Sequence, residues 1–475
     1  MITSTIKTIK KNPALTLNAV IIAAALLPAV TFAAGYKLNE QSAAGMGSAH
    51  AGLAAMAEDA SVVFYNPAAM TELDRAQMTA GFTYINATGD FDGSSVNAAG
   101  APSLSEGYDD GGNYLGEAFI PFFYYVRPVN ENVSIGLGIF TPFGTNTDYG
   151  DNFSGGGFAD ETSLISIEIQ PSIAVKINDQ LSVGGGIDIV YMEGLLSKQI
   201  DLVPSPIGGA QGFENKFEVS GDDWGYGWNL GAYFKLTEAT TVGLTYRSEI
   251  DIVLTGDSSF EDQTDLSFYS SAASAVLGPF PSRDQASKVP LVTPESATLA
   301  ITHQLTDALL LQGGATWTGW SSFQYFDIIA TENTTGGLGD GFVDVSDLSD
   351  LGQGYVGHIV EEWEDVWAIA LGGTYQLNDR VVLRVGYAFD ESPVSDQYRT
   401  ARVPSSDRQW LTIGAGYVIN ADLSVDVAAG YLYMERMSLD ETNKDLNDET
   451  TGAARLTGDY EIDVFGLSAQ VNYKF

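Results

Sequence analysis

Hydrophobic and polar residues alternate with a period of two along several stretches of the chain. Isoleucine or valine occupies most odd-numbered positions from 165 to 177, with serine, glutamate, glutamine and lysine among the residues between them. Residues 381–390 and 422–433 repeat the pattern. Because successive side chains of a strand point to opposite faces, each stretch predicts a strand with one apolar and one polar face. Such strands, about ten or more residues long, are typical of barrels that face lipid outside and a lumen inside.

Reading the whole chain in this way predicts fourteen strands, an even number as expected for a bacterial barrel. No segment after the N-terminal region has about 18 uninterrupted apolar residues, so a membrane-embedded chain must close its strands into a barrel. We therefore expect an all-β, antiparallel transmembrane β-barrel over residues 74–475. The predicted strands are 76–90, 114–128, 132–144, 161–178, 180–199, 214–236, 239–254, 293–305, 308–328, 363–378, 380–392, 408–419, 422–437 and 459–475.

The connections between these strands alternate in length. Tight polar turns stand near residues 130–132, 178–179 and 378–379, whereas the segments near 255–292 and 329–362 are long. Short periplasmic turns and long extracellular loops are the barrel pattern. The last strand alternates up to Phe475, an ending that resembles the signal read by the outer-membrane assembly machinery.

Residues 34–73 do not alternate and are rich in glycine, alanine and methionine. A stretch this small has no core of its own, so it is either a plug (hatch) inside the barrel or a disordered tail. We favour the plug. Residues 1–33 predict a cleaved signal peptide, with Lys7, Lys10 and Lys11 before an apolar stretch and Thr31-Phe32-Ala33 at its end.

Composition excludes several classes of function. The net charge of −39 provides no basic footprint for nucleic acid, and the absence of cysteine rules out disulfides. We expect no cofactor, no metal site and no enzyme activity, because His50, His303 and His358 stand in no catalytic or metal motif. The ten acidic residues in 327–366 favour a solvated loop surface over bridging of lipopolysaccharide by divalent cations.

The N-terminal region contains the segments 34–40 (AGYKLNE), 45–47 (GMG), 57–60 (AEDA) and 65–68 (YNPA). These segments resemble the hatch of the FadL-type transporters of long-chain fatty acids and hydrocarbons. Further matches follow in order at 221–229 (GDDWGYGWN), 245–248 (TYRS), 294–296 (PES), 320–323 (WSSF), 389–394 (FDESPV) and 402–410 (RVPSSDRQW). The resemblance implies a fourteen-stranded monomeric barrel with an N-terminal hatch, which binds a hydrophobic ligand and releases it sideways at a kinked third strand.

The third strand carries the residues that would form such a lateral gate, Gly138, Pro142, Phe143 and Gly144. Proline lacks a ladder donor and glycine permits unusual dihedrals, so both can break the pairing locally. Without the resemblance, an ordinary strand end at the barrel rim is the simpler interpretation. The hatch motif Asn66, Pro67 and Ala68 either turns the chain into the first strand or holds the hatch against the wall opening.

Candidate ligand contacts are apolar and basic. Phe268, Leu277 and Phe280 belong to an amphipathic pattern within 255–292, which is either one wall of a capture groove or a helix that caps the barrel mouth. Phe323 and Phe326 are further apolar candidates. The basic candidates for pairing with a ligand carboxylate are Lys198, Arg247 and Arg384. Each of them could equally belong to an ion pair with an acidic residue of the lumen. The acidic Asp327 would repel a carboxylate and favours a neutral hydrocarbon. The main alternatives to a fatty acid transporter are a channel for aromatic or alkane hydrocarbons, a lipid hydrolase and a non-specific porin.

Overall fold

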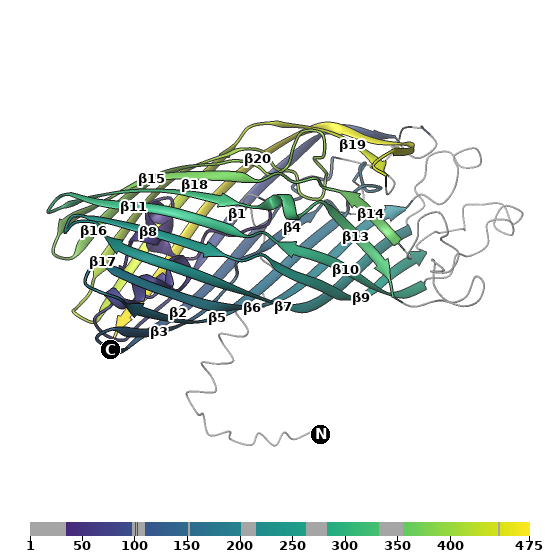
Figure 1. Ribbon diagram of the computed structural model, residues 1–475. Helices are drawn as coiled ribbons and strands as arrows, with labels where there is room; N and C mark the ends of the chain where they lie inside the picture. The colour runs from purple at the N-terminus through teal and green to yellow at the C-terminus, as the bar shows by residue number, and fades with distance from the viewer. Residues whose placement is uncertain are drawn as a thin grey trace, which may run out of the picture.

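The strands of the protein close into one antiparallel barrel (Figure 1). The structure, a computed structural model, describes residues 35–96, 100, 102, 110–150, 153–200, 215–262, 283–331, 355–444 and 447–475. The first strand, β1 (Gln77–Val96), pairs with the last, β20 (Thr450–Lys474), from Gln77 opposite Lys474 to Val96 opposite Arg455. This pairing removes both sheet edges, which is the condition for a strand protein to lie in hydrocarbon.

The wall is made of fourteen strands, as predicted, and six of them are interrupted. The continuous strands are β1, β2 (Glu117–Asn130), β5 (Glu161–Lys176), β6 (Leu181–Ile200), β7 (Asn215–Lys235), β16 (Val381–Asp390), β17 (Arg408–Val418) and β20. The interrupted strands are β3 (Val133–Phe140) with β4 (Gly144–Asp148), β8 (Thr240–Arg247) with β9 (Ile250–Asp262), β10 (Arg283–Thr293) with β11 (Ser296–Thr306), β12 (Leu309–Thr318) with β13 (Tyr325–Ala330), β14 (Tyr355–Val360) with β15 (Val366–Asn378), and β18 (Leu423–Met434) with β19 (Met437–Lys444).

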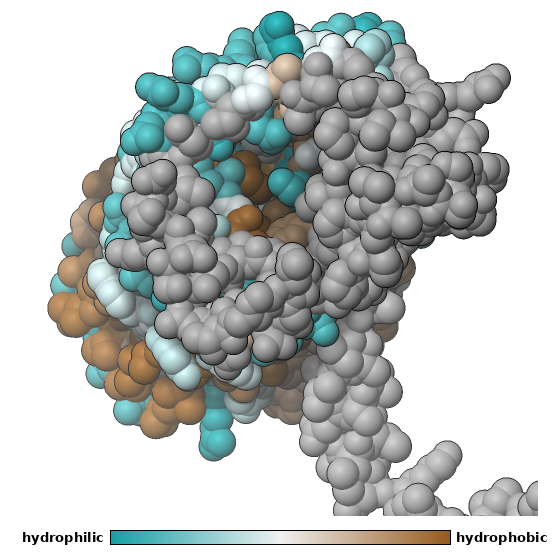
Figure 2. Space-filling view, turned by 90° about the vertical axis from the view of Figure 1, so that its right-hand side faces the viewer, coloured by the Kyte–Doolittle hydropathy of each residue, from teal (hydrophilic) through white to brown (hydrophobic). Residues whose placement is uncertain are grey.

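The outer and inner faces of the wall differ as the alternation requires. Outward side chains such as Ile173, Leu371 and Ile413 are large, apolar and more than half exposed, and brown apolar residues cover much of the outer wall in Figure 2. On β5, Glu168 and Gln170 point inward and are fully buried. The exposed apolar face suits hydrocarbon, and the polar face is buried because the lumen is filled.

The long connections are shorter than the sequence predicts. Strand β9 extends to Asp262 and β10 begins at Arg283, so both ends of the predicted loop 255–292 are strand. Likewise β13 reaches Ala330 and β14 runs from Tyr355 to Val360 inside the predicted loop 329–362. The predicted amphipathic segment with Phe268, Leu277 and Phe280 lies outside the described residues.

The N-terminal hatch fills the lumen at the end of the barrel where the C-terminus lies (Figure 1). It contains α2 (Ala43–Gly47), η1 (Leu53–Ala55), α3 (Val62–Tyr65) and η2 (Pro67–Glu72). Its small residues lie directly against the wall: a Cβ added to Gly386 would lie 2.1 Å from the carbonyl carbon of Ser48. The predicted plug is thereby confirmed, and its glycine- and alanine-rich composition permits this close approach. Within the described residues, no helix is long and apolar enough to cross a membrane.

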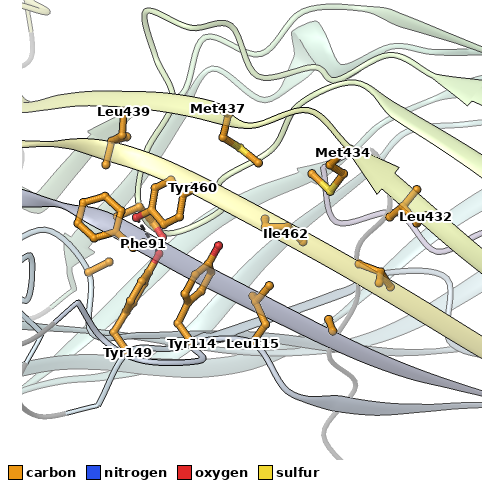
Figure 3. Packing of buried hydrophobic residues seen from close by; sticks show 14 of the residues in the cluster. Phe91, Tyr114, Leu115, Tyr149, Leu432, Met434, Met437, Leu439, Tyr460 and Ile462 are labelled. Atoms are coloured by element: carbon orange, nitrogen blue, oxygen red, sulfur yellow. Dashed lines mark hydrogen bonds between the residues drawn. The ribbon is translucent and has the colours of Figure 1, made fainter.

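An aromatic cluster packs against the inside of the opposite half of the barrel (Figure 3). Tyr149 stacks on Tyr114 with ring centroids 4.6 Å apart, and its hydroxyl lies 2.9 Å from that of Tyr460 on β20. Phe91 of β1 packs on Tyr460 at 4.7 Å. This cluster joins the β4–β5 connection to the inner faces of β1 and β20.

Candidate ligand cavities and the interrupted third strand

An apolar cavity lies in the lumen, lined by residues of β5, β6, β7, β9 and β10. Figure 2 looks onto this end of the barrel and shows a recess in which apolar residues are visible. The predicted ligand residues Phe323 and Phe326 both line the cavity. Other apolar residues of its lining are Leu164, Leu196, Val219, Leu254, Val289, Leu291 and Trp363.

Among the described residues that line this cavity, Glu361 and Arg402 are the charged ones. Arg402 is buried, and its Nη1 donates to the Ser197 carbonyl (3.1 Å) and the Thr162 hydroxyl (3.3 Å). Glu361 accepts a hydrogen bond of 2.8 Å from the indole of Trp363. Arg402 thus hydrogen-bonds to neutral groups beside an apolar cavity, while the charges of Glu441, Glu361 and Asp160 act on it without forming an ion pair within the described residues. A guanidinium in this position can donate to the carboxylate of a ligand.

Tyr36 of the hatch lines the apolar cavity. Its ring lies edge-on to Trp320 (4.7 Å between centroids) and Phe323 (5.6 Å), and Phe143 follows at 6.0 Å. Its hydroxyl donates to the Val292 carbonyl at 2.7 Å. Tyr36 thus belongs to a cluster of aromatic side chains at the edge of this cavity.

A second cavity lies around the hatch, next to Tyr36 in the chain. Residues 37–40 and His50 of the hatch line it, together with Pro142 and Phe143 of the wall. Strand β8 contributes Arg247, and β16 contributes Asp390. This cavity is more polar than the first and reaches the interrupted third strand.

The third wall strand is broken between Phe140 and Gly144. Strand β2 pairs with β3 up to Phe122 opposite Phe140, and no pairing of β2 with β4 occurs in the part of the chain that the structure describes. The hatch occupies the gap instead: the Leu38 N–H donates to the Pro142 carbonyl, and the Gly144 N–H donates to the Tyr36 carbonyl, both at 2.8 Å. The wall at this point is therefore completed by the hatch and not by a neighbouring strand.

The predicted gate residues do not all lie at this gap. Pro142, Phe143 and Gly144 do, and Phe143 is further held by two hydrogen bonds with the Ser166 hydroxyl. Gly138 lies within regular β3, opposite Tyr124 and Gln170.

The hatch motif of Asn66, Pro67 and Ala68 lies elsewhere, against β6 and β7. The Asn66 side chain donates to the carbonyls of Ala54 (2.6 Å) and Ala232 (3.0 Å) and accepts from the Ala68 N–H (3.1 Å). Pro67 opens η2, where its missing N–H leaves no donor unpaired. These bonds tie two hatch turns to the wall.

The three predicted cations have different surroundings. Arg247 contacts the carboxylates of Glu168 (2.5 Å) and Asp188 (2.9 Å), and Arg384 contacts Asp426 (2.7 Å) and Glu58 (3.0 Å). Lys198 lines a third, polar cavity, which Arg402 also lines. Arg247 and Arg384 are thus neutralised by two carboxylates each.

Sequence reasoning did not assign Arg402, Tyr36 or Glu361 to the site. A signal for Arg402 is present in the printed sequence, because this arginine stands between Ala401 and Val403 with no acidic residue beside it. Tyr36 and Glu361 carry no comparable local signal, since a fold is needed to bring residues so far apart to one cavity.

A closed β-barrel with an apolar exterior, a plugged lumen and an apolar cavity has the architecture of an outer-membrane transport protein. The model of one protein family, "Outer membrane protein transport protein (OMPP1/FadL/TodX)", matches residues 24–475. The chain belongs to this family. It is an outer-membrane protein of a Gram-negative bacterium, and its family is one of transport proteins.

Individual relatives agree with this assignment. The long-chain fatty acid transport protein of Escherichia coli O6:H1 is 29% identical over 97% of this chain and 98% of its own length. Outer membrane protein P1 of Haemophilus influenzae Rd is also 29% identical, over 93% of this chain and 95% of its own length.

Solved structures show the same fold. A Pseudomonas aeruginosa FadL homologue superimposes with a TM-score of 0.79 at 26% identity and covers 93% of this chain and 100% of its own. The Pseudomonas putida toluene transporter TodX superimposes with a TM-score of 0.61 at 17% identity, with 88% and 94% coverage, and supports the fold alone.

Proposed function

We propose that this protein carries hydrophobic small molecules, long-chain fatty acids or hydrocarbons, passively across the outer membrane. The ligand enters the apolar cavity, passes Tyr36 and leaves sideways between β3 and β4. The proposal rests on the observation that one hatch segment contacts both the cavity and the gap in the wall. The Tyr36 side chain lines the apolar cavity, and the backbone of Tyr36 and Leu38 is hydrogen-bonded to the wall at the gap.

Binding requires no energy source. Each CH2 group that leaves water for an apolar cavity gains roughly 0.8 kcal/mol. The contacts that hold the hatch segment in the gap are the bonds Leu38 to Pro142, Gly144 to Tyr36 and Tyr36 to Val292. At about 0.5–1.5 kcal/mol net for each bond, they contribute about 1.5–4.5 kcal/mol. Roughly two to six buried CH2 groups offset that amount, so a ligand that displaces Tyr36 can shift the segment.

Fatty acids are the favoured ligand class because Arg402 offers a charged partner beside the cavity. Asp327 binds His358 at 2.6 Å and is absent from the cavity lining, so the repulsion expected from the sequence does not apply. A hydrocarbon channel is the second candidate, favoured by the apolar character of the remaining lining. TodX of P. putida, which shares the fold, is a toluene transporter.

We propose transport without catalysis, as a single barrel. A fatty-ester hydrolysis assay tests the absence of catalysis, and the mass of the purified protein in detergent tests the monomeric state.

Phe475 remains the proposed contact for the assembly machinery. Its side chain is exposed, and its N–H donates to the Ala76 carbonyl (2.8 Å). Loss of barrel assembly on its deletion would support that contact. The hatch argues against an open porin. Measuring the conductance of the protein in planar bilayers before and after deletion of the hatch tests this point.

The main experiment fills the cavity. A Cβ on Gly194 would meet the tip of Leu254 at 2.8 Å, so a larger side chain there extends among the cavity residues. We expect Gly194→Phe to lower binding and uptake of palmitate about tenfold. Gly313→Phe is the matched control, because Gly313 on β12 lines none of the three cavities. Equal uptake by both variants would contradict the proposal.

A further inference from the structure

Lys37 occupies the point at which the hatch completes the barrel wall. It forms an antiparallel bridge with Phe143, between the two hydrogen bonds that flank the gap. Along extended backbone, neighbouring side chains point to opposite faces. Accordingly Tyr36 lines the apolar cavity and Lys37 lines the larger lumen cavity. The ammonium group therefore stands on the lumen side of the gap.

The charges around Lys37 leave it available. The cations that line the lumen cavity among the described residues are Lys37 and Arg247, and Arg247 is bound by two carboxylates. No ion pair or hydrogen bond of the Lys37 side chain occurs within the described residues. Burial and the nearby Arg247 lower the pKa of Lys37 to about 8, and Asp390 opposes this effect. At neutral pH the side chain is therefore largely protonated.

The acidic and titratable groups of the same cavity have their own partners. Glu40 accepts a hydrogen bond from the Asn39 N–H (3.0 Å), and Asp390 lies 3.9 Å from the guanidinium of Arg408. His50 lies 3.3 Å from the Tyr65 hydroxyl. Within the described part of the chain, none of these groups forms an ion pair or a hydrogen bond with the Lys37 ammonium, and Asp390 acts on it only through its charge.

A fatty acid that passes Tyr36 has to leave Arg402 behind. An ionised carboxylate without a counter-charge is strongly disfavoured away from water. We propose that Lys37 receives the carboxylate of a long-chain fatty acid in the lumen cavity, as a second cationic station on the far side of Tyr36 from Arg402. This inference rests on the proposed function and deepens it, because it names carboxylates as the class that the exit route selects. A neutral molecule of the same length does not need Lys37.

The test compares uptake of radiolabelled palmitate and hexadecanol by proteoliposomes that contain the full chain. We expect Lys37→Met to lower palmitate uptake about tenfold, the usual size of one charge-assisted contact, and to leave hexadecanol uptake unchanged. Lys37→Arg should restore most palmitate uptake. Lys176→Met is the matched control, because Lys176 pairs with Asp179 at a short turn and lines none of the three cavities.

Two outcomes would overturn the inference. If Lys37→Met lowers both probes equally, Lys37 only supports the structure of the gap. If it lowers neither, no carboxylate contact exists there. In both cases the wild type still takes up hexadecanol, which distinguishes these results from failure of the proposed function, where the wild type takes up neither probe.

Discussion

A reversible covalent lock on the hatch tests whether the gap between β3 and β4 is the exit. The double variant Lys37→Cys/Phe143→Cys places two thiols at the bridge between hatch and wall. The hydrogen bonds on both sides of this pair make it a non-hydrogen-bonded antiparallel pair, for which Cα atoms lie about 4.5 Å apart. That spacing is within the range for a disulfide. The chain contains no other cysteine, so only this bond forms.

The size of the expected effect follows from the contacts that the lock replaces. Three hydrogen bonds worth about 1.5–4.5 kcal/mol in total keep the segment closed in the free protein, which corresponds to an open fraction of roughly one in ten to one in two thousand. A bound ligand raises the open fraction. A disulfide prevents opening, however large the binding free energy of the ligand is. Uptake of hexadecanol should therefore fall to background when the variant is oxidised.

Hexadecanol is the probe because it does not depend on the charge of Lys37. Treatment with a reductant should restore uptake in the same preparation, while the wild type and each single-cysteine variant should not respond. Palmitate binding in the apolar cavity should survive oxidation, because the lock lies below Tyr36. Undiminished hexadecanol uptake by the oxidised protein would refute lateral exit at this gap.

Three further outcomes are expected. Arg402→Met should weaken palmitate binding about tenfold and leave hexadecanol binding unchanged, as measured by titration of the purified protein; equal loss of both would assign Arg402 to packing. Arg384→Met leaves Asp426 and Glu58 without their shared cation, and the loss of one partner of a buried ion pair is destabilising by about 3–5 kcal/mol. The hatch should therefore loosen, and the conductance of the variant in planar bilayers should rise. A conductance equal to that of the wild type would contradict this prediction. Raising the pH through about 8 should remove the preference of wild-type uptake for palmitate over hexadecanol, because Lys37 then loses its proton. If uptake by Lys37→Met shows the same dependence on pH, another group is responsible for the change.

The length of the outer strands could not be predicted from alternation. The outer part of β9 contains Thr255, Gly256, Asp257, Ser258 and Ser259, which are polar or small on both faces. A period of two in hydropathy arises only where one face meets hydrocarbon and the other meets the lumen. Strands that continue beyond the apolar belt lose this signal, so the sequence assigned them to loops.

The charged residues of the site show a second limit. Lys198, Arg247 and Arg384 were equivalent candidates in the sequence, but the fold brings Glu168 and Asp188, from two different strands, to Arg247. Arg402 instead reaches an apolar cavity with only neutral hydrogen-bond partners. Whether a cation is neutralised depends on contacts between distant segments, and no local pattern encodes those contacts.

The sequence by itself determined the barrel, its number of strands, the hatch and the positions of the short turns. These features follow from a local rule, because a membrane requires each strand to present one apolar face and every backbone group to be paired. Only the tertiary structure decided that Tyr36, Lys37 and Leu38 complete the wall at Pro142, Phe143 and Gly144. That pairing joins segments about a hundred residues apart, and its existence depends on how the closed barrel positions the hatch in its lumen.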